Sequence, residues 1–538
     1  MAEEGPIIDV PKKSPPEGTR EAPHTVEGIL KELGPGLIVA GAVVGSGELI
    51  ATTATGAEAG FYLMWLILIG CLIKVFVQVE MGRYAICTGE TSLKGMSEVP
   101  GPRIGRANWV LWFWLLTIVV TTGQLGGIVG GVGQSLAIST PVTKAGKEYN
   151  ELMHAETQMQ VMMRKQARER PIDEFTTEQE LDRRIGEGEV LLNYARYWND
   201  NKHRKNELRS AAKDHLIWAG IVALASTVLL VRGRYGFIQL FVTVLVGLFT
   251  LMTIVNVILL QMNSDFGMTV EEFKSGLSFQ LPPKEEGVFP LATALATFGI
   301  IGVAAGEMVF YPYWCIEKGY AKFVGPNDGS GDWVRRARGW VKVLRWDAFL
   351  SMVVYTISTV AFYVLGAAIL NRVNLVPKGM EMIRTLSVMY EPVFGVTAQS
   401  IFLVGAIAVL YSTFFVTNAS KARMCSDALR LFNLRADTEA ERIRWLKIFS
   451  AAFPLMCFAV YWSFPKPTTL VLAGGVMQSI LLPVMACTAM WFRYRKCDPR
   501  VLPGRAWDLM LWISAAGMFV AGGWLAITKL FPALKQFG

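Results

Sequence analysis

Two acidic residues, each placed beside glycine within a long apolar run, are the residues best suited to chemistry in this sequence. Glu48 follows Gly45-Ser46-Gly47, and Glu307 follows Gly306. A carboxylate at mid-membrane depth is costly unless it is paired or hydrated, so such acids are functional candidates. A helix break at that depth is tolerated only where the backbone lines a cavity or is buried in protein. Two breaks in corresponding halves of a chain indicate a transporter's binding site.

The elements that must position these acids are membrane spans. The chain has 538 residues, of which 52% are hydrophobic and 18% are charged, whereas about a quarter are charged in an average soluble protein. About eleven apolar runs are long enough to cross a bilayer. They cover residues 35–58, 61–86, 108–137, 215–231, 236–260, 290–315, 347–370, 393–418, 445–463, 469–492 and 507–530. We therefore predict an all-α polytopic membrane protein.

The positive charges lie in alternate loops between these runs. The formal net charge of +8 could suggest nucleic acid as a partner, but the distribution follows the positive-inside rule instead. We expect no nucleic-acid partner, and we expect the lipid bilayer and a divalent cation substrate as partners. We predict that the chain lies in the plasma (inner) membrane. The pattern places its N-terminus in the cytoplasm and, after eleven spans, its C-terminus outside.

The chain divides into four segments by composition. We predict a disordered cytoplasmic tail at 1–33, spans one to three at 34–139, a charged extramembrane insert at 140–214, and spans four to eleven at 215–538. The insert is expected on the outer face, with a helix over 147–170 that Pro171 ends and a second over 177–213 interrupted near Gly186 and Gly188. It would pack on itself, with Tyr194 and Trp198 on its apolar face, or form a homodimer contact.

The two acidic motifs begin the first and the sixth span. A repeat of five spans plus five, followed by one extra helix, would place them in equivalent positions. Because each half has an odd number of spans, the halves must have opposite orientations in the membrane. This is the arrangement of an inverted-topology repeat.

Several separate segments resemble the Nramp family of divalent-metal transporters. The resemblance rests on Gly34-Pro35-Gly36, Phe61-Tyr62-Leu63-Met64-Trp65, Gln78, Thr88, Gly89, Tyr235, Leu245-Val246-Gly247-Leu248, Ile301-Gly302 and Tyr311. It covers most of the spans but not the insert. The resemblance implies a LeuT-like fold with a 5+5 inverted repeat plus one helix, and a divalent cation as substrate.

The functional motifs depart from that family. Its first span carries Asp-Pro-Gly-Asn, where this chain has Gly45-Ser46-Gly47-Glu48. Its sixth span carries Met-Pro-His. Aligned through Tyr311, this chain has Gly306-Glu307-Met308 there, whereas internal symmetry makes Glu307 the counterpart of Glu48. The third span has Gln124 but no acid, and all four histidines lie outside the spans or at their edge. Proton coupling of the usual family kind is therefore not expected.

A site with two carboxylates, hydroxyls and backbone carbonyls offers hard oxygen ligands, which suit Mg²⁺ or Mn²⁺. We predict that the cation is the substrate and that there is no resident cofactor. Candidate binding residues, from the acids and from the family alignment, are Glu48, Glu307, Gly45, Ser46, Gly306, Met308 and Tyr311. Accessory polar or charged partners are Lys74, Gln124 and Gln478.

Other interpretations stay open at this stage. Lys74 lies in an apolar stretch of the second span, so it should face the interior and could pair with Glu48 or Glu307. A neutralised site could take an organic cation or an amino acid on the same fold. The chain could also be a transport-inactive scaffold or sensor that binds a partner through the insert. No nucleophile elbow or His/Cys cluster is visible, so an enzyme is not expected.

Overall fold

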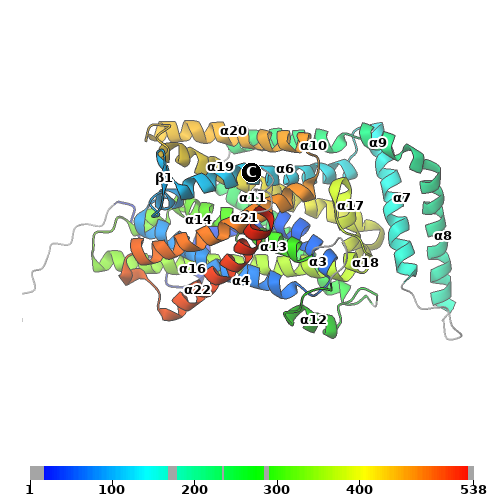
Figure 1. Cartoon of the computed structure of the whole chain (residues 1–538), viewed down its shortest axis with the longest axis horizontal. Helices are drawn as coiled ribbons and strands as arrows, with labels where there is room; N and C mark the ends of the chain where they lie inside the picture. The colour runs from blue at the N-terminus through cyan, green and yellow to red at the C-terminus, as the bar shows by residue number, and fades with distance from the viewer. Residues whose placement is uncertain (1–16, 168–177, 233–234, 264, 284–289, 531–538) are drawn as a thin grey trace, which may run out of the picture.

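Among the described residues, the helical spans follow one another in the predicted order. The computed structural model describes residues 17–167, 178–232, 235–263, 265–283 and 290–530. Within these residues ten apolar helices are long enough to cross a membrane, and α11, apolar over Gly247–Leu260, supplies the fifth predicted span. The predicted all-α polytopic membrane protein is confirmed. Figure 1 shows most of the long helices running along the long axis of the molecule.

The spans have the following bounds: α2 (Pro35–Val43), η1 (Gly47–Thr52) and α3 (Thr53–Ala59); α4 (Met64–Thr88); α6 (Trp109–Ser139); α10 (Asp214–Arg232); α11 (Tyr235–Leu260); α13 (Pro290–Ile300) and α14 (Ala305–Lys318); α16 (Gly331–Leu365) and η3 (Gly366–Asn371); α19 (Ala398–Leu431); α20 (Glu439–Ser463); α21 (Pro467–Trp491) and η7 (Phe492–Lys496); α22 (Arg505–Leu525) and η9 (Ala526–Leu530).

Shorter elements join the spans: α1 (Val26–Glu32), α5 (Ser92–Met96), β1 (Arg103–Ile104), β2 (Ala107–Asn108), η2 (Lys202–Arg204), α9 (Lys205–Ala211), α12 (Val270–Leu277), α15 (Tyr320–Val324), η4 (Gly379–Glu381), α17 (Met382–Ser387), η5 (Val388–Tyr390), α18 (Glu391–Phe394), η6 (Gly395–Thr397) and η8 (Pro499–Val501). β1 and β2 pair as an antiparallel ribbon.

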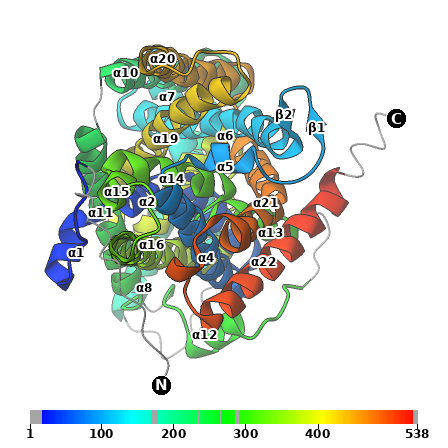
Figure 2. The ribbon, with the colours of Figure 1, turned by 90° about the vertical axis from the view of Figure 1, so that its left-hand side faces the viewer.

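The first and sixth spans are both broken where the sequence predicts. The first span stops at Val43 and resumes at Gly47, and the sixth stops at Ile300 and resumes at Ala305. The two breaks touch each other, since a Cβ added at Gly47 would lie 2.7 Å from the Ile300 carbonyl oxygen. Glycine is therefore required at this crossing. The end-on view in Figure 2 places α2 and α14 near the middle of the bundle and α22 at its edge.

Asp347 holds the beginning of the first span in place. It lies inside α16, and its carboxylate accepts the Gly34 N–H at 3.0 Å and the Gly36 N–H at 2.5 Å. The first N–H groups of a helix have no partner within the helix, so a carboxylate there satisfies them and complements the helix dipole. The seventh span thereby fixes the position of the first.

The N-terminal segment is ordered from residue 17 onward. Thr25 caps α1, Arg20 pairs with Glu32 at 2.7 Å, and the Arg20 guanidinium lies over the ring of Phe323. The prediction of a disordered tail over 1–33 is thus wrong for residues 17–33, because these contacts dock the segment on α15 and α16. Residues 1–16 lie outside the described part of the chain.

The insert is a helical hairpin at one end of the bundle, which we call the insert end. Its helices α7 (Lys144–Gln166) and α8 (Glu178–Asn201) lie side by side and run across the direction of the long spans (Figure 1). Trp198 packs on a small core that includes Tyr149 and Leu208. The predicted interruption near Gly186 and Gly188 is wrong, because α8 continues through both glycines. Pro171 lies outside the described residues.

Candidate functional site

Both acids occupy the first turn of the second half of a broken span. Glu48 lies at the beginning of η1 and Glu307 at the beginning of α14. Glu48 is fully buried and Glu307 is 8% exposed. Their charges are close enough to interact. A helix N-terminus carries partial positive charge, so each break stabilises a carboxylate at the centre of the bundle.

A cavity of about 30 Å³ lies beside the two breaks. Five of the residues predicted from sequence line it, namely Ser46, Gln124, Gly306, Glu307 and Gln478. The other lining residues include Ala42, Val43, Trp114, Thr117, Ile118, Thr121, Phe310, Thr413, Thr417, Lys421 and Met424. Most of these come from the first half of α6 and from residues 413–424 of α19, and α2 and α14 supply the rest, so the cavity extends from the breaks away from the insert end.

A larger cavity follows at that opposite end of the bundle, with a volume of about 460 Å³. Tyr313 of α14 and Asp427 of α19 both line it, and the Tyr313 hydroxyl donates to Asp427 at 2.7 Å. Tyr313 lies within one turn of Phe310 on α14, and Asp427 lies within one turn of Met424 on α19. Phe310 and Met424 both line the central cavity. The two cavities therefore succeed one another between α14 and α19.

Glu307 contributes a carboxylate oxygen without a hydrogen bond to the central cavity. Its Oε2 is buried and makes no hydrogen bond, and the same is true of the Thr417 hydroxyl on α19. Buried polar atoms are nearly always hydrogen-bonded in proteins, so two polar atoms without hydrogen bonds in one cavity need an explanation. A carboxylate oxygen and a hydroxyl oxygen are ligands that a hard cation prefers.

Glu48 is held differently. It does not line the cavity, and its carboxylate accepts hydrogen bonds from the Gly45 N–H and the Thr359 hydroxyl, each at 3.2 Å. Gly45 itself is closed in by Thr413, whose hydroxyl would lie 1.6 Å from a Cβ at that position. The structure thus brings the two acids near each other but leaves only Glu307 on the cavity wall.

Gln478 links the sixth-span break to the third span. Its Oε1 accepts the Gly306 N–H at 3.0 Å, and its Nε2 donates to Gln124 Oε1 at 3.0 Å. These bonds satisfy one of the free N–H groups at the beginning of α14. Both predicted accessory glutamines therefore belong to one chain of hydrogen bonds along the cavity wall.

Besides Glu48 and Gly45, three predicted residues lie away from the cavity. Met308 and Tyr311 are fully buried in the apolar core, and the Tyr311 hydroxyl donates to Asp347 at 3.0 Å. Lys74 is buried as expected, but its ammonium donates to the carbonyl oxygens of Phe298 and Ile301, the latter at 2.7 Å. The anticipated ion pair of Lys74 with an acid is thus replaced by bonds to the carbonyls that the sixth-span break exposes.

Lys421 is a cavity residue that the sequence analysis missed. It lies on α19 with Thr417 and Met424, and it is 2% exposed. The predicted eighth span ended at residue 418, which assigned Lys421 to a loop, whereas α19 continues to Leu431. The spacing 417, 421 and 424 is that of one helix face and could have revealed it.

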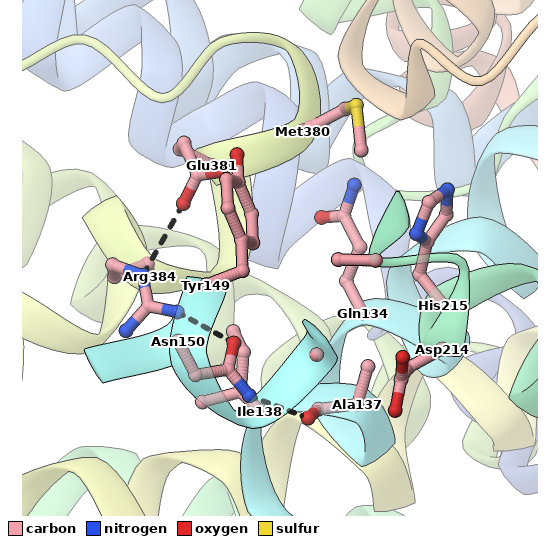
Figure 3. Close-up of a pocket in the computed structure, with 12 residues that line it drawn as sticks. Gln134, Ala137, Ile138, Tyr149, Asn150, Asp214, His215, Met380, Glu381 and Arg384 are labelled. Carbon is pink, nitrogen blue, oxygen red and sulfur yellow. Dashed lines mark hydrogen bonds and ion pairs between the residues drawn. The ribbon is translucent and has the colours of Figure 1, made fainter. Parts of the chain in front are cut away.

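A second small cavity, of about 40 Å³, lies where the insert meets the bundle (Figure 3). Tyr149 of α7 donates to Glu381 at 2.6 Å, and Arg384 of α17 bonds both Glu381 and Asn150. Figure 3 shows these side chains in a row on one side of the cavity, with His215 on the opposite side. They join the insert to the segment between the seventh and eighth spans, but the described residues contain no group of three His, Cys, Asp or Glu side chains that could hold a metal ion.

The natural resistance-associated macrophage protein-like (Nramp) family model matches residues 211–528, more than half of the chain. The chain belongs to the Nramp family. Its place in a family of membrane transporters agrees with the apolar helices, and the protein is an integral membrane protein.

Relatives of this Nramp chain include two proteins named divalent metal cation transporter MntH. The one from Caldanaerobacter subterraneus subsp. tengcongensis is 31% identical over 116 residues, which are 22% of this chain and 27% of the relative. The one from Clostridium acetobutylicum is 29% identical over 123 residues, which are 23% and 28% of the two chains. The matched segments thus span about a quarter of the length of these relatives.

Solved structures of a manganese transporter from Eremococcus coleocola share the fold of this Nramp chain. The complex with an aromatic bis-isothiourea substituted compound has a TM-score of 0.53 at 14% identity, covering 94% of this chain and 88% of that one. A mutant of the same transporter has a TM-score of 0.52 at 14% identity, with the same coverage. The LeuT-like fold that the sequence resemblance implied is confirmed.

Proposed function

We propose that this Nramp chain is a secondary transporter of a divalent metal cation, with Mg²⁺ or Mn²⁺ favoured. The observation that supports this most is the buried Glu307 Oε2, which has no hydrogen bond and lies on a cavity between the two broken helices. The names of the MntH relatives point to the same substrate class. Substrate would be carried by alternating access around the breaks.

The cavity suits an ion better than an organic solute. A site needs about 10–15 Å³ of accessible volume for each water molecule, so about 30 Å³ leaves room for an ion with few waters. Glu307, Ser46 and Thr417 supply oxygen ligands, which suit Mg²⁺ and Mn²⁺. Met424 adds a thioether, a softer ligand that favours Mn²⁺ over Mg²⁺.

Transport would depend on the membrane potential and not on the usual proton relay. The cavity wall contains no histidine, the residue that most often carries protons near neutral pH. In the orientation that the positive-inside pattern gives, with a cytoplasmic N-terminus in the plasma (inner) membrane, the potential favours cation entry by roughly 2.3 kcal/mol per charge per 100 mV. The insert would then lie outside.

Calorimetric titration of the purified protein with Mg²⁺, Mn²⁺ and Ca²⁺ tests the proposal. We expect binding in the wild type, its loss in Glu307→Gln, and a weaker effect of about tenfold or less in Glu48→Gln, which is up to 1.4 kcal/mol. Liposome flux of the bound ion follows. Binding of amines or amino acids without any metal effect would contradict the proposal and favour an organic substrate. Binding of neither class would favour a transport-inactive scaffold.

A further inference from the structure

The central cavity contains a positive charge of its own. Lys421 lines the same cavity as Glu307, and the two charges interact. A cavity built to bind a cation should repel an ammonium group, so its presence beside the free carboxylate needs a functional account. Buried lysines are expensive in a membrane unless they have a role or a partner.

Lys421 makes only long hydrogen bonds, and both of their acceptors are neutral groups. Its ammonium donates to the Thr122 hydroxyl at 3.2 Å and to the Ile118 carbonyl at 3.4 Å, both on α6. These distances are at the long end of the range for hydrogen bonds in proteins. Its flexible four-carbon stem allows the charge to move.

The second buried lysine near the acids is held firmly. Lys74 donates to two carbonyl oxygens at the sixth-span break and does not line the cavity. Glu48 and Glu307 are therefore balanced by one fixed ammonium and one that faces the cavity. Among these groups, only Lys421 shares the space that a bound cation would occupy next to Glu307.

We propose that Lys421 is a tethered counter-cation, which pairs with Glu307 whenever substrate leaves and withdraws to Thr122 and Ile118 when a metal ion binds. This inference rests on the proposed transport function. A carrier must return through the membrane without substrate, and an unpaired carboxylate buried during that step would be strongly unfavourable. The ammonium of Lys421 removes that penalty, at the cost of competing with the metal ion for Glu307.

Two transport modes separate this role from simple substrate binding. Net uptake into empty liposomes requires the return of the unloaded carrier, whereas exchange of external for internal Mn²⁺ requires only loaded carriers. A tethered counter-cation is needed for the first mode and not for the second. Its removal should also strengthen Mn²⁺ binding, because the competing charge is gone.

The experiment compares wild type with Lys421→Met in liposomes, using radioactive Mn²⁺ at a clamped membrane potential. We expect Lys421→Met to bind Mn²⁺ about tenfold more tightly, to keep exchange, and to lose about nine-tenths of net uptake. Lys421→Arg, which keeps the charge, should retain net uptake. Lys447→Met, which removes an exposed lysine on α20, is the matched control and should behave as wild type.

Several outcomes would overturn the role of Lys421. Unchanged net uptake in Lys421→Met would show that the empty carrier does not need the ammonium. Loss of exchange together with uptake, in a variant that melts as wild type does, would make Lys421 part of the substrate path. If Lys421→Met does not fold, Lys421→Gln keeps a donor for Thr122 and gives the same test. Wild type that neither binds nor exchanges Mn²⁺ would instead reject the proposed function itself, and this inference with it.

Discussion

The side-chain amides of Gln124 and Gln478 are joined by a hydrogen bond of 3.0 Å that links α6 to α21 at the level of the sixth-span break. The same Gln478 accepts the N–H of Gly306, the residue before Glu307. The position of the free carboxylate therefore depends on a contact between the third and tenth spans.

Loss of the Gln478 amide should weaken cation binding without removing any carboxylate. Gln478→Leu leaves the Gly306 N–H and Gln124 unpaired, and an unsatisfied buried polar group costs about 1–3 kcal/mol. We expect at least about tenfold weaker Mn²⁺ binding by calorimetry. Gln478→Glu keeps the acceptor for Gly306 and adds negative charge, so it should bind at least as tightly as wild type. Equal affinity in Gln478→Leu would show that this bond does not position Glu307.

Asp347 should stabilise the protein more than its tyrosine partner does. Asp347→Asn removes the charge that caps α2 and directs an amide donor at one of two backbone N–H groups. We expect a loss of about 1–2 kcal/mol and, for a chain of this length, a melting temperature lower by about 1–2 °C. Tyr311→Phe removes only one hydroxyl donor to Asp347 and should lower the melting temperature by less. The opposite ranking would argue against Asp347 as the cap of the first span.

Gly45 should not tolerate a side chain. A Cβ there would lie 1.6 Å from the Thr413 hydroxyl, so Gly45→Ala must push α2 away from α19. Such overpacking typically costs about 1–3 kcal/mol. Thermal unfolding should show this loss, and the second change Thr413→Ala should restore part of it. No rescue by Thr413→Ala would mean that Gly45 is needed for its backbone conformation instead.

The contact between the insert and the segment before the eighth span should depend on pH through Glu391. Burial raises the pKa of Glu391 from 4.5 to about 7. Its carboxylate accepts from Gln158 of α7 at 2.5 Å. Both residues line a cavity of about 180 Å³ that the Lys165–Glu187 ion pair also lines. Glu391 therefore binds its proton more tightly when the insert is docked on this segment than when the insert is released from it. Docking is therefore strongest below pH 4.5 and weakens as the pH rises through 7.

Hydrogen exchange of α7, corrected for the intrinsic rate, measures this pH effect. We expect protection to fall between pH 5 and pH 8, by about tenfold or more. Glu391→Gln cannot ionise and should keep its protection across that range. Equal pH dependence in wild type and Glu391→Gln would assign the effect to another group.

The sequence by itself determined the membrane class, the order of eleven spans and the two breaks. Apolar runs of about 20 residues are typical of membrane helices, and a carboxylate beside glycine within such a run indicates a break. It also indicated Gln124 and Gln478, because polar side chains in spans face the interior. These conclusions depend on local composition, which a single sequence contains in full.

Only the tertiary structure decided which of these residues meet. Lys74 contacts carbonyls of a break more than two hundred residues away, Tyr311 turns to Asp347, and Lys421 enters the cavity because α19 extends past its apolar run. The direction of a side chain is set by how its helix is rotated and packed against neighbours distant in sequence. For that reason the two acids were visible in the sequence, whereas the lysine that faces one of them was not.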